Sequence, residues 1–271
     1  MPAIRSNVFI PLLLNSLDGI MNDLGREYAR AYKASRQRQD ESAEISMRVK
    51  FIAGIANKHA LGRPSLLDVC CGNGLMVKSL NGKYACVGID NDADAIRNAS
   101  KIAKGAKFYV ADMLGMHLDK KFDILTCFDA IDHGDELRRD IGKILKGFYL
   151  HLNKGGTVIF SVPLCSKQWE NKQSSASTFA HKGKRWVYLY KRYIGTDGSF
   201  CTDKIIISID GDRIRHNFQS VTYKFAVPLL KAGRISNIAK KLGFKVRVYA
   251  GLSGRRWAES STEGPVFVCT K

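Results

Sequence analysis

Hydrophobic and polar positions along the chain follow two periodic patterns. Short apolar runs bounded by glycine, asparagine or aspartate predict strands, and apolar residues three or four positions apart predict helices. In the first part of the chain the strands are predicted at 65–70, 85–89, 107–110, 122–128 and 157–162. The helices are predicted at 47–60, 74–80, 92–103 and 137–152. Because strands and helices take turns, the pattern predicts an α/β fold with a parallel sheet and right-handed crossovers.

After residue 163 the pattern changes. Residues 165–184 are polar and rich in Ser and Lys, which predicts a mobile loop. Three strand-like runs joined by Asp-Gly turns then predict an antiparallel sheet, at 185–194, 204–209 and 213–226. The alternation of helices and strands then resumes, with a helix predicted at 231–242 and strands at 244–249 and 266–270.

The first predicted strand ends in Asp68-Val-Cys-Cys-Gly-Asn-Gly74, which opens a helix. Glycine lets the backbone turn sharply and approach a ligand closely, so this turn suits a nucleoside or dinucleotide cofactor. Asp90 ends the second strand, 22 residues after Asp68, where a carboxylate can accept hydrogen bonds from both ribose hydroxyls. Asp112 follows the third strand, placed to accept from an adenine amino group.

Together with Gly-Ile-Asp (88–90), Ala-Asp-Met (111–113), Phe-Asp-Ile-Leu-Thr-Cys (122–127) and Leu-Asn-Lys-Gly-Gly-Thr (152–157), the turn resembles the class I S-adenosylmethionine-dependent methyltransferase signature. The oxidoreductase pattern needs glycine where this chain has Val77. The resemblance implies a Rossmann-like fold with a mostly parallel, seven-stranded sheet and S-adenosyl-L-methionine as cofactor.

The cofactor-binding residues expected from this resemblance are Asp68, Cys70, Gly72, Asn73, Gly74, Asp90, Asn91, Ala111, Asp112, Met113 and Phe128. Asp68, Gly72 and Gly74 would hold the methionine part of the cofactor, Asp90 the ribose, and Asp112 with Met113 the adenine. In the alternative interpretation Asp68 only caps the turn, and Met113 only fills the core.

A finer resemblance, to glycine/sarcosine and amino-sugar N-methyltransferases, rests on Gly-Arg-Glu-Tyr-Ala-Arg-Ala-Tyr (25–32), the antiparallel insertion and Arg215-His216-Asn-Phe. It implies an N-terminal helical lid (1–60), a core (61–163 and 227–271) and an antiparallel cap (164–226). Tyr28 and Tyr32 would contact the cofactor or the acceptor, and His216 the acceptor. Alternatively, the tyrosines pack a helix on a sheet and His216 is structural or solvated.

The segment after the fourth strand, Asp129-Ala-Ile-Asp132-His133, is expected on the acceptor side. Paired carboxylates at Asp129 and Asp132 could hold a cationic amine, and Asp132 or His133 could take a proton from it. Asp132 and His133 are the predicted catalytic residues. Asp132 could instead cap the next helix. The segment lacks the Asn-Pro-Pro-Tyr pattern, so methylation of adenine N6 is not indicated.

The formal net charge of +18 is uneven: residues 1–166 contribute +5 and residues 167–271 contribute +13. Such a field attracts anions, RNA included, or reflects a basic source proteome. Trp186, Tyr188, Tyr190 and Tyr193 lie among these charges, which keeps an RNA methyltransferase as the alternative to a small-molecule N- or O-methyltransferase. A third hypothesis is a non-catalytic cofactor- or partner-binding protein.

Seven cysteines occur without a Cys-x-x-Cys pair, and the six histidines lack ligand spacing, so we expect neither disulfides nor a metal. Free thiols in apolar runs are typical of the reducing cytoplasm. No apolar stretch reaches the length of a membrane span, roughly 18–20 residues. The apolar run at 8–14 contains Pro11 and is predicted as a packed helix rather than a signal peptide. The sequence does not indicate the acceptor or the oligomeric state.

Overall fold

A computed structural model gives the arrangement of the chain. It describes residues 23–24, 27–28, 31, 40–56, 62–131, 140–162, 173–194, 200–223, 231–259, 261 and 263–271. The chain divides into two compact units: residues 45–166 with 226–271, and residues 1–44 with 167–225.

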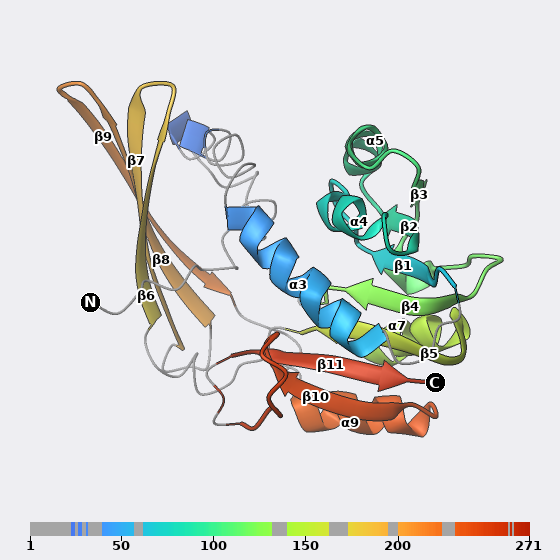
Figure 1. Ribbon diagram of the computed structural model, residues 1–271. Coiled ribbons are helices and arrows are strands. Elements are labelled where there is room, and N and C mark those ends of the chain that lie inside the picture. The colour runs from blue at the N-terminus through green and yellow to red at the C-terminus, as the bar shows by residue number, and fades with distance from the viewer. Residues whose placement is uncertain are drawn as a thin grey trace. The chain divides into compact units, whose positions relative to one another are not determined.

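The larger unit holds a seven-stranded sheet in the order β10-β11-β5-β4-β1-β2-β3 (Figure 1). Its strands are β1 (Ser65–Val69), β2 (Ala85–Asp90), β3 (Lys107–Val110), β4 (Phe122–Cys127), β5 (Leu152–Ser161), β10 (Lys245–Ala250) and β11 (Pro265–Thr270). All neighbours pair in parallel except β11, which is antiparallel to both β5 and β10. The predicted α/β fold with a mostly parallel seven-stranded sheet is therefore confirmed.

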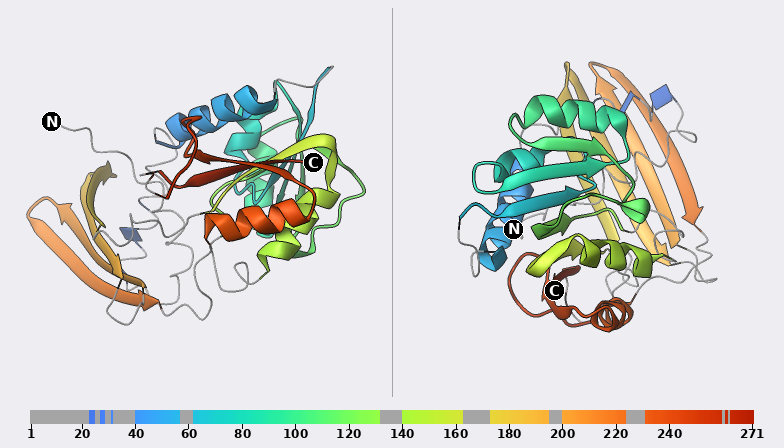
Figure 2. Two further views of the ribbon diagram at one scale, coloured as in Figure 1. Left: turned by 90° about the horizontal axis from the view of Figure 1, so that it is seen from below. Right: turned by 90° about the vertical axis from the view of Figure 1, so that its right-hand side faces the viewer.

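Helices cover both faces of this sheet (Figure 2). They are α3 (Asp40–Ala56), α4 (Leu75–Leu80), α5 (Ala93–Ile102), α7 (Ile141–Leu150) and α9 (Ala232–Lys241), with a short 3-10 turn η1 (Met113–Gly115). One apolar cluster joins α7 and α9 to the sheet through side chains such as Ile144, Phe148 and Ile235. A second cluster joins α3, α4 and α5 to the other face through Ile52, Val77 and Ile96.

The fifth strand begins earlier than predicted. Helix α7 ends at Leu150 and β5 starts at Leu152, so residues 152–156, predicted as a helix end and a turn, already belong to the strand. Leu152 is opposite Phe122, and the register shifts before Thr157 pairs with Ile124. The irregularity accommodates the glycine pair, because Gly155 has φ 78° and a Cβ on Gly156 would lie 3.0 Å from the Phe122 carbonyl oxygen.

The smaller unit is an antiparallel sheet in the order β6-β7-β8-β9. Its strands are β6 (Gln173–His181), β7 (Lys184–Ile194), β8 (Phe200–Asp210) and β9 (Arg213–Tyr223). Leu24, Tyr28 and Ala31 pack against Trp186, Tyr188 and Ile206 on one face of it. Glu27 is also tied to this sheet, because Lys184 donates a hydrogen bond to its carboxylate and Arg215 forms an ion pair with it.

The prediction of a mobile loop at 165–184 is wrong over its second half. Residues 173–181 form β6, an edge strand that pairs along its whole length with β7. The sequence of β6, Gln-Ser-Ser-Ala-Ser-Thr-Phe-Ala-His, does not show the apolar pattern of a strand. An edge strand forms its backbone hydrogen bonds with one neighbour and needs few large apolar side chains.

Candidate functional site

The predicted glycine turn lies at the carboxyl end of β1. The backbone enters the left-handed region at Cys70 (φ 58°), Gly72 (φ 52°) and Gly74 (φ 76°), and α4 begins at Leu75. The Cys71 amide donates to the Ile89 carbonyl oxygen at 2.9 Å, and the Gly74 amide donates to the Cys71 carbonyl oxygen at 3.0 Å. The first bond ties the turn to the end of β2, and the second closes the turn on itself.

Close packing explains the glycine at position 74. A Cβ there would lie 2.7 Å from the Ala99 Cβ and 3.0 Å from the Ala99 Cα, both in α5. Neither atom can swing away, since one is backbone and the other is fixed to it. Any side chain at Gly74 would therefore push α4 and α5 apart, in addition to its unfavourable φ.

Asp90 connects the turn to the second strand. Its Oδ2 accepts a hydrogen bond from the Gly72 amide at 2.8 Å, and its Oδ1 accepts from the Asp92 amide at 3.0 Å. The carboxylate predicted to bind a ribose thus has a fixed orientation beside the glycine turn. Each oxygen keeps a second lone pair with which to accept a ligand hydroxyl.

Asp68 is the buried acid of the site. Only 2% of the residue is exposed, and Thr126 on β4 donates from its Oγ1 to the Asp68 Oδ1 at 2.8 Å. Burial raises the pKa of the Asp68 carboxyl to about 7, although the Thr126 hydrogen bond and the positive charge of Arg48 both act to lower it. The hydrogen bond joins β1 to β4, and the role of Asp68 toward the cofactor stays a prediction.

The third strand is followed by the predicted adenine-binding pair. The Asp112 Oδ1 accepts from the Leu114 amide at 3.0 Å, and the residue caps η1 while remaining exposed. Met113 is buried, with its Sδ 3.7 Å from the Cys127 Sγ. The burial of Met113 agrees with the alternative interpretation, in which this side chain fills the core. A contact between Met113 and the adenine stays a prediction.

The carboxyl end of β4 carries a charged network that the sequence did not reveal. Arg48 of α3 forms an ion pair with Asp129, and its guanidinium carbon lies 4.8 Å from the centre of the Phe128 ring. The Asp129 amide donates to the Ser161 Oγ at 2.9 Å, and the same Oγ donates to the Asp129 Oδ1 at 3.1 Å. Asp129 has φ 54°, so these contacts hold it in a conformation that is uncommon outside glycine.

The sequence does not mark Arg48 as a site residue, because it lies 81 positions before its partner Asp129. Its segment was predicted as a helix from its apolar residues, but helical spacing alone does not show which charged side chain reaches the sheet. Arg48 contributes to the electrostatics of two predicted site residues, since it pairs with Asp129 and lowers the pKa of Asp68.

The remaining predicted residues have different placements. Of the expected cofactor set, those at the ends of β1, β2 and β4 come together: Asp68, Cys70, Gly72, Asn73, Gly74, Asp90, Asn91 and Phe128. Ala111 follows β3, and its amide donates to the Asp90 carbonyl oxygen at 2.9 Å. Tyr32 and the predicted catalytic residues Asp132 and His133 lie outside the described residues.

Tyr28 and His216 belong to the smaller unit. Tyr28 is fully buried, with its ring centre 5.3 Å from that of Tyr188 and 5.8 Å from that of Trp186, as its packing alternative requires. His216 is exposed on β9, opposite Ile207 of β8. A role of either residue in acceptor binding stays a prediction.

Within the described part of the chain, no group of three or more His, Cys, Asp or Glu side chains is arranged to hold a metal ion. The described helices are also too short or too polar to cross a bilayer.

The sequence profile of a family described as "Methyltransferase domain" matches residues 35–247. A curated relative, the dTDP-3-amino-3,6-dideoxy-alpha-D-glucopyranose N,N-dimethyltransferase of Streptomyces fradiae, is 28% identical over 110 residues, which cover 40% of this chain and 43% of the relative. The match spans half or less of the length of such curated relatives.

Two solved structures share the fold. The sugar N-methyltransferase KedS8 from Streptoalloteichus superposes with a TM-score of 0.67 at 16% identity, covering 100% of this chain and 98% of that one. The S-adenosylmethionine-bound amino pentose methyltransferase CalS10 from Micromonospora echinaspora superposes with a TM-score of 0.65 at 16% identity, covering 90% of this chain and 96% of that one.

Proposed function

The chain belongs to the methyltransferase-domain family, and on that premise we propose that it transfers a methyl group from S-adenosylmethionine to a nitrogen atom of a small-molecule acceptor. The observation that carries the proposal is the joining of the glycine turn to Asp90. The Gly72 amide, in the left-handed part of the turn, donates to the carboxylate that a ribose would approach.

The residues present fit this cofactor. A Cβ on Gly72 would meet no atom within 4 Å, so the turn has bare backbone on an open side, where a ligand can come close. Asp90 offers acceptors to ribose hydroxyls, and the partly protonated Asp68 would become fully ionised beside a cationic ammonium group such as that of the methionine part. The sulfonium of S-adenosylmethionine supplies an activated methyl group when it is bound.

Arg48 alters the expected role of Asp129. Because the carboxylate of Asp129 is already paired with Arg48, it is a weaker partner for a cationic amine than the sequence suggested. We assign Asp129 instead to the positioning of Arg48 beside Phe128. A nitrogen acceptor must lose a proton before or during attack, and Asp132 and His133 remain our proposed bases.

The relatives named above act on amino sugars or are described as sugar or amino pentose methyltransferases, so an amino sugar is the acceptor class that we propose. For the same reason an RNA acceptor is not our proposal. We retain residues 1–60 as a lid and 164–226 as a cap over the acceptor. In this scheme the chain's own residues orient the acceptor nitrogen, exclude water and take up its proton.

Calorimetric titration with S-adenosylmethionine tests the cofactor assignment. The Asp90→Ala variant is expected to bind about 5- to 150-fold more weakly, because charge-assisted hydrogen bonds are lost. Asp119→Ala, at a fully exposed carboxylate, is the matched control and should bind like the wild type. Equal affinity in Asp90→Ala would refute the ribose assignment, and absence of binding to the wild type would refute the proposed function.

Transfer is tested separately, by incubating the protein with S-adenosylmethionine and an amino sugar linked to a nucleoside diphosphate. Mass spectrometry should show one or two added methyl groups, and fragmentation should place them on nitrogen. Methylation on oxygen only, or of an added RNA but not of the sugar, would contradict the acceptor proposal while leaving the cofactor assignment intact.

A further inference from the structure

One edge of the large sheet is rich in lysine. The strands begin at this edge, except β11, which ends there, so the arrows of β1 and β4 point away from the edge and that of β11 points toward it (Figure 1). The glycine turn, Asp90 and Asp129 lie at the carboxyl ends of their strands and therefore at the opposite edge. Strands of five or six residues keep the two edges about 17–20 Å apart.

The first half of this edge lies at the start of β1, β2 and β3. Its exposed cations are Arg63, Lys83, Lys104 and Lys107. Hydrogen bonds hold the three connections together, because Arg63 donates to the Asn81 carbonyl oxygen and the Asn81 Nδ2 donates to the Lys104 carbonyl oxygen at 3.0 Å. The residues that join these strands to the preceding helices contain neither Asp nor Glu, so this half is purely cationic.

The second half lies at the start of β4, β5 and β10 and at the end of β11. Its lysines are Lys120, Lys121, Lys154, Lys240, Lys245 and Lys271. The Gly155 amide donates to the Lys271 carbonyl oxygen at 3.0 Å, which joins two of the connections. Burial lowers the pKa of the Lys271 ammonium, and the nearby charge of Lys121 lowers it further. Of the two carboxylates here, Asp119 is exposed, and Asp123 is half-buried and bonded to Ser65 and Asn153.

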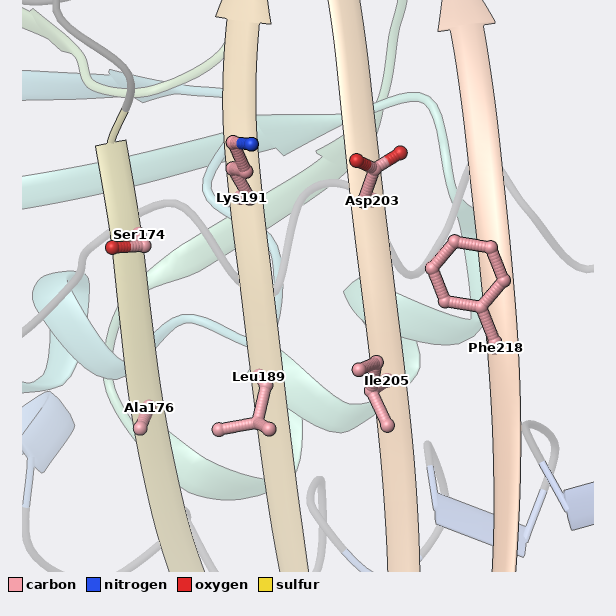
Figure 3. Close-up of a pocket in the computed structure, with 7 residues that line it drawn as sticks. All are labelled: Ser174, Ala176, Leu189, Lys191, Asp203, Ile205 and Phe218. Carbon is pink, nitrogen blue, oxygen red and sulfur yellow. The ribbon is translucent and has the colours of Figure 1, made fainter.

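The two halves form one continuous surface, which we call the cationic edge. Seven strands at a spacing of about 4.8 Å give it a length of about 30 Å. Salt screens exposed charges over about 8–10 Å, which is more than one strand spacing, so neighbouring cations act together on an approaching anion. A groove on the smaller sheet is different, because Figure 3 shows Lys191 beside Asp203 there, among uncharged side chains.

Apolar groups at the cationic edge distinguish a lipid surface from a nucleic acid. Leu150, the last residue of α7, is 54% exposed, and the carbonyl oxygen of the preceding Tyr149 accepts a hydrogen bond from Lys271. A leucine among lysines gains free energy by entering the headgroup region of a bilayer, but it adds nothing to contacts with the phosphates of RNA. The rings of Tyr84 and Phe122, on which bases could stack, are only 3% and 1% exposed.

We propose that the cationic edge binds the surface of a membrane that contains anionic phospholipids, with its lysines at the headgroup phosphates and Leu150 in the interface. Clusters of four to eight lysines or arginines are enough for such binding. The glycine turn and Asp90 would face away from the lipid, because they lie at the other end of the strands. Membrane binding would therefore leave the cofactor site accessible, and it does not depend on the proposed methyl transfer.

Sedimentation with lipid vesicles tests the charge requirement. The full chain should bind vesicles of phosphatidylcholine and phosphatidylglycerol, but not vesicles of phosphatidylcholine alone. The double variant Lys154→Glu/Lys245→Glu should bind at least about 20-fold more weakly, because each lysine near such a surface contributes a factor of about five. The matched control is Lys50→Glu/Lys231→Glu, which changes the net charge equally at exposed positions in α3 and at the start of α9. It should bind like the wild type.

The exposed leucine provides a second test in the same vesicles. Leu150→Ser should bind about 3- to 10-fold more weakly than the wild type, because less apolar surface enters the interface. Met47→Ser is the matched control, since Met47 is 53% exposed in α3 and lines a groove with Tyr249, at the other end of the strands. It should bind like the wild type, whereas equal weakening of the two variants would contradict the proposed orientation.

Acetylation of the wild type gives a test that does not depend on the folding of a variant. Vesicles with phosphatidylglycerol should protect the amines of Lys154 and Lys245, while Lys50 and Lys231 react equally with and without vesicles. The proposal is overturned by equal reactivity of all four lysines, by equal binding to the two kinds of vesicle, by equal binding of the two double variants, or by a wild type that binds RNA but no vesicles.

Discussion

At the scale of single residues, Asp68 and Asp123 show how neighbouring groups set the charge of a carboxyl. The pKa of Asp68 rises to about 7 because the side chain is buried. Burial also acts to raise the pKa of Asp123, but hydrogen bonds from the backbone amide and hydroxyl of Ser65 and from the side-chain amide of Asn153 outweigh it and lower the pKa. Asp68 therefore stabilises the fold when its carboxyl is neutral, and Asp123 stabilises it when its carboxyl is ionised.

This difference predicts opposite effects of two Asp→Asn changes. The favourable contribution of neutral Asp68 is complete below pH 3.8 and is lost as the pH rises through about 7. Asp68→Asn should therefore be more stable than the wild type at pH 8, by at most about 4 kcal/mol, with a smaller gain at pH 5. Asp123→Asn should be less stable than the wild type at both values, since ionised Asp123 stabilises the fold above its unfolded pKa of 3.8. Urea unfolding at the two pH values measures both changes, and equal gains for Asp68→Asn at pH 5 and pH 8 would contradict the raised pKa.

At the scale of elements, the turn between β1 and α4 is confined by α5. Gly74→Ala places a Cβ against Ala99 and forces a left-handed φ of 76° on a non-glycine residue. We expect a loss of about 2–4 kcal/mol in the free energy of unfolding and weaker cofactor binding. Gly82→Ala is the control, because its Cβ would meet no atom within 4 Å. Thermal unfolding compares the two, and equal melting temperatures would show that the turn can relax.

Helix α3 is joined to β4 by the pair Arg48 and Asp129. Both side chains are largely shielded, at 16% and 20% exposure, so their attraction is only partly screened by water. A double-mutant cycle with Arg48→Met and Asp129→Asn should give a coupling free energy of about 1–3 kcal/mol in unfolding experiments. Additive effects would mean that the pair does not couple the helix to the sheet.

The alternation of strands and helices predicted the central fold and the glycine turn well, because apolar runs in a buried parallel sheet are nearly continuous. Two features could not be predicted for physical reasons. β6 gains its stability from backbone pairing with β7 rather than from its small polar side chains. Arg48 lies 81 positions before Asp129, so no local pattern marks their contact.

At the scale of the whole molecule, cofactor binding would link stability to the concentration of S-adenosylmethionine. Because only the folded chain holds the glycine turn beside Asp90, the cofactor shifts the unfolding equilibrium toward the native state. We expect the melting temperature of the wild type to rise by several degrees at about 100 times the dissociation constant, and that of Asp90→Ala to rise less at the same cofactor concentration. Differential scanning calorimetry measures this, and equal rises in the two proteins would contradict the ribose assignment.

The contacts of Glu27 and Tyr28 also bear on how the chain folds during its synthesis on the ribosome. Glu27 pairs with Arg215, 188 residues later, and Tyr28 packs on Trp186. At a synthesis rate of about 5–20 residues per second, the amino-terminal segment waits about 10–40 s for these partners. During that interval Leu24 and Tyr28 lack Trp186 and Tyr188, which pack on them in the folded chain, and apolar surface exposed in this way is what chaperones bind.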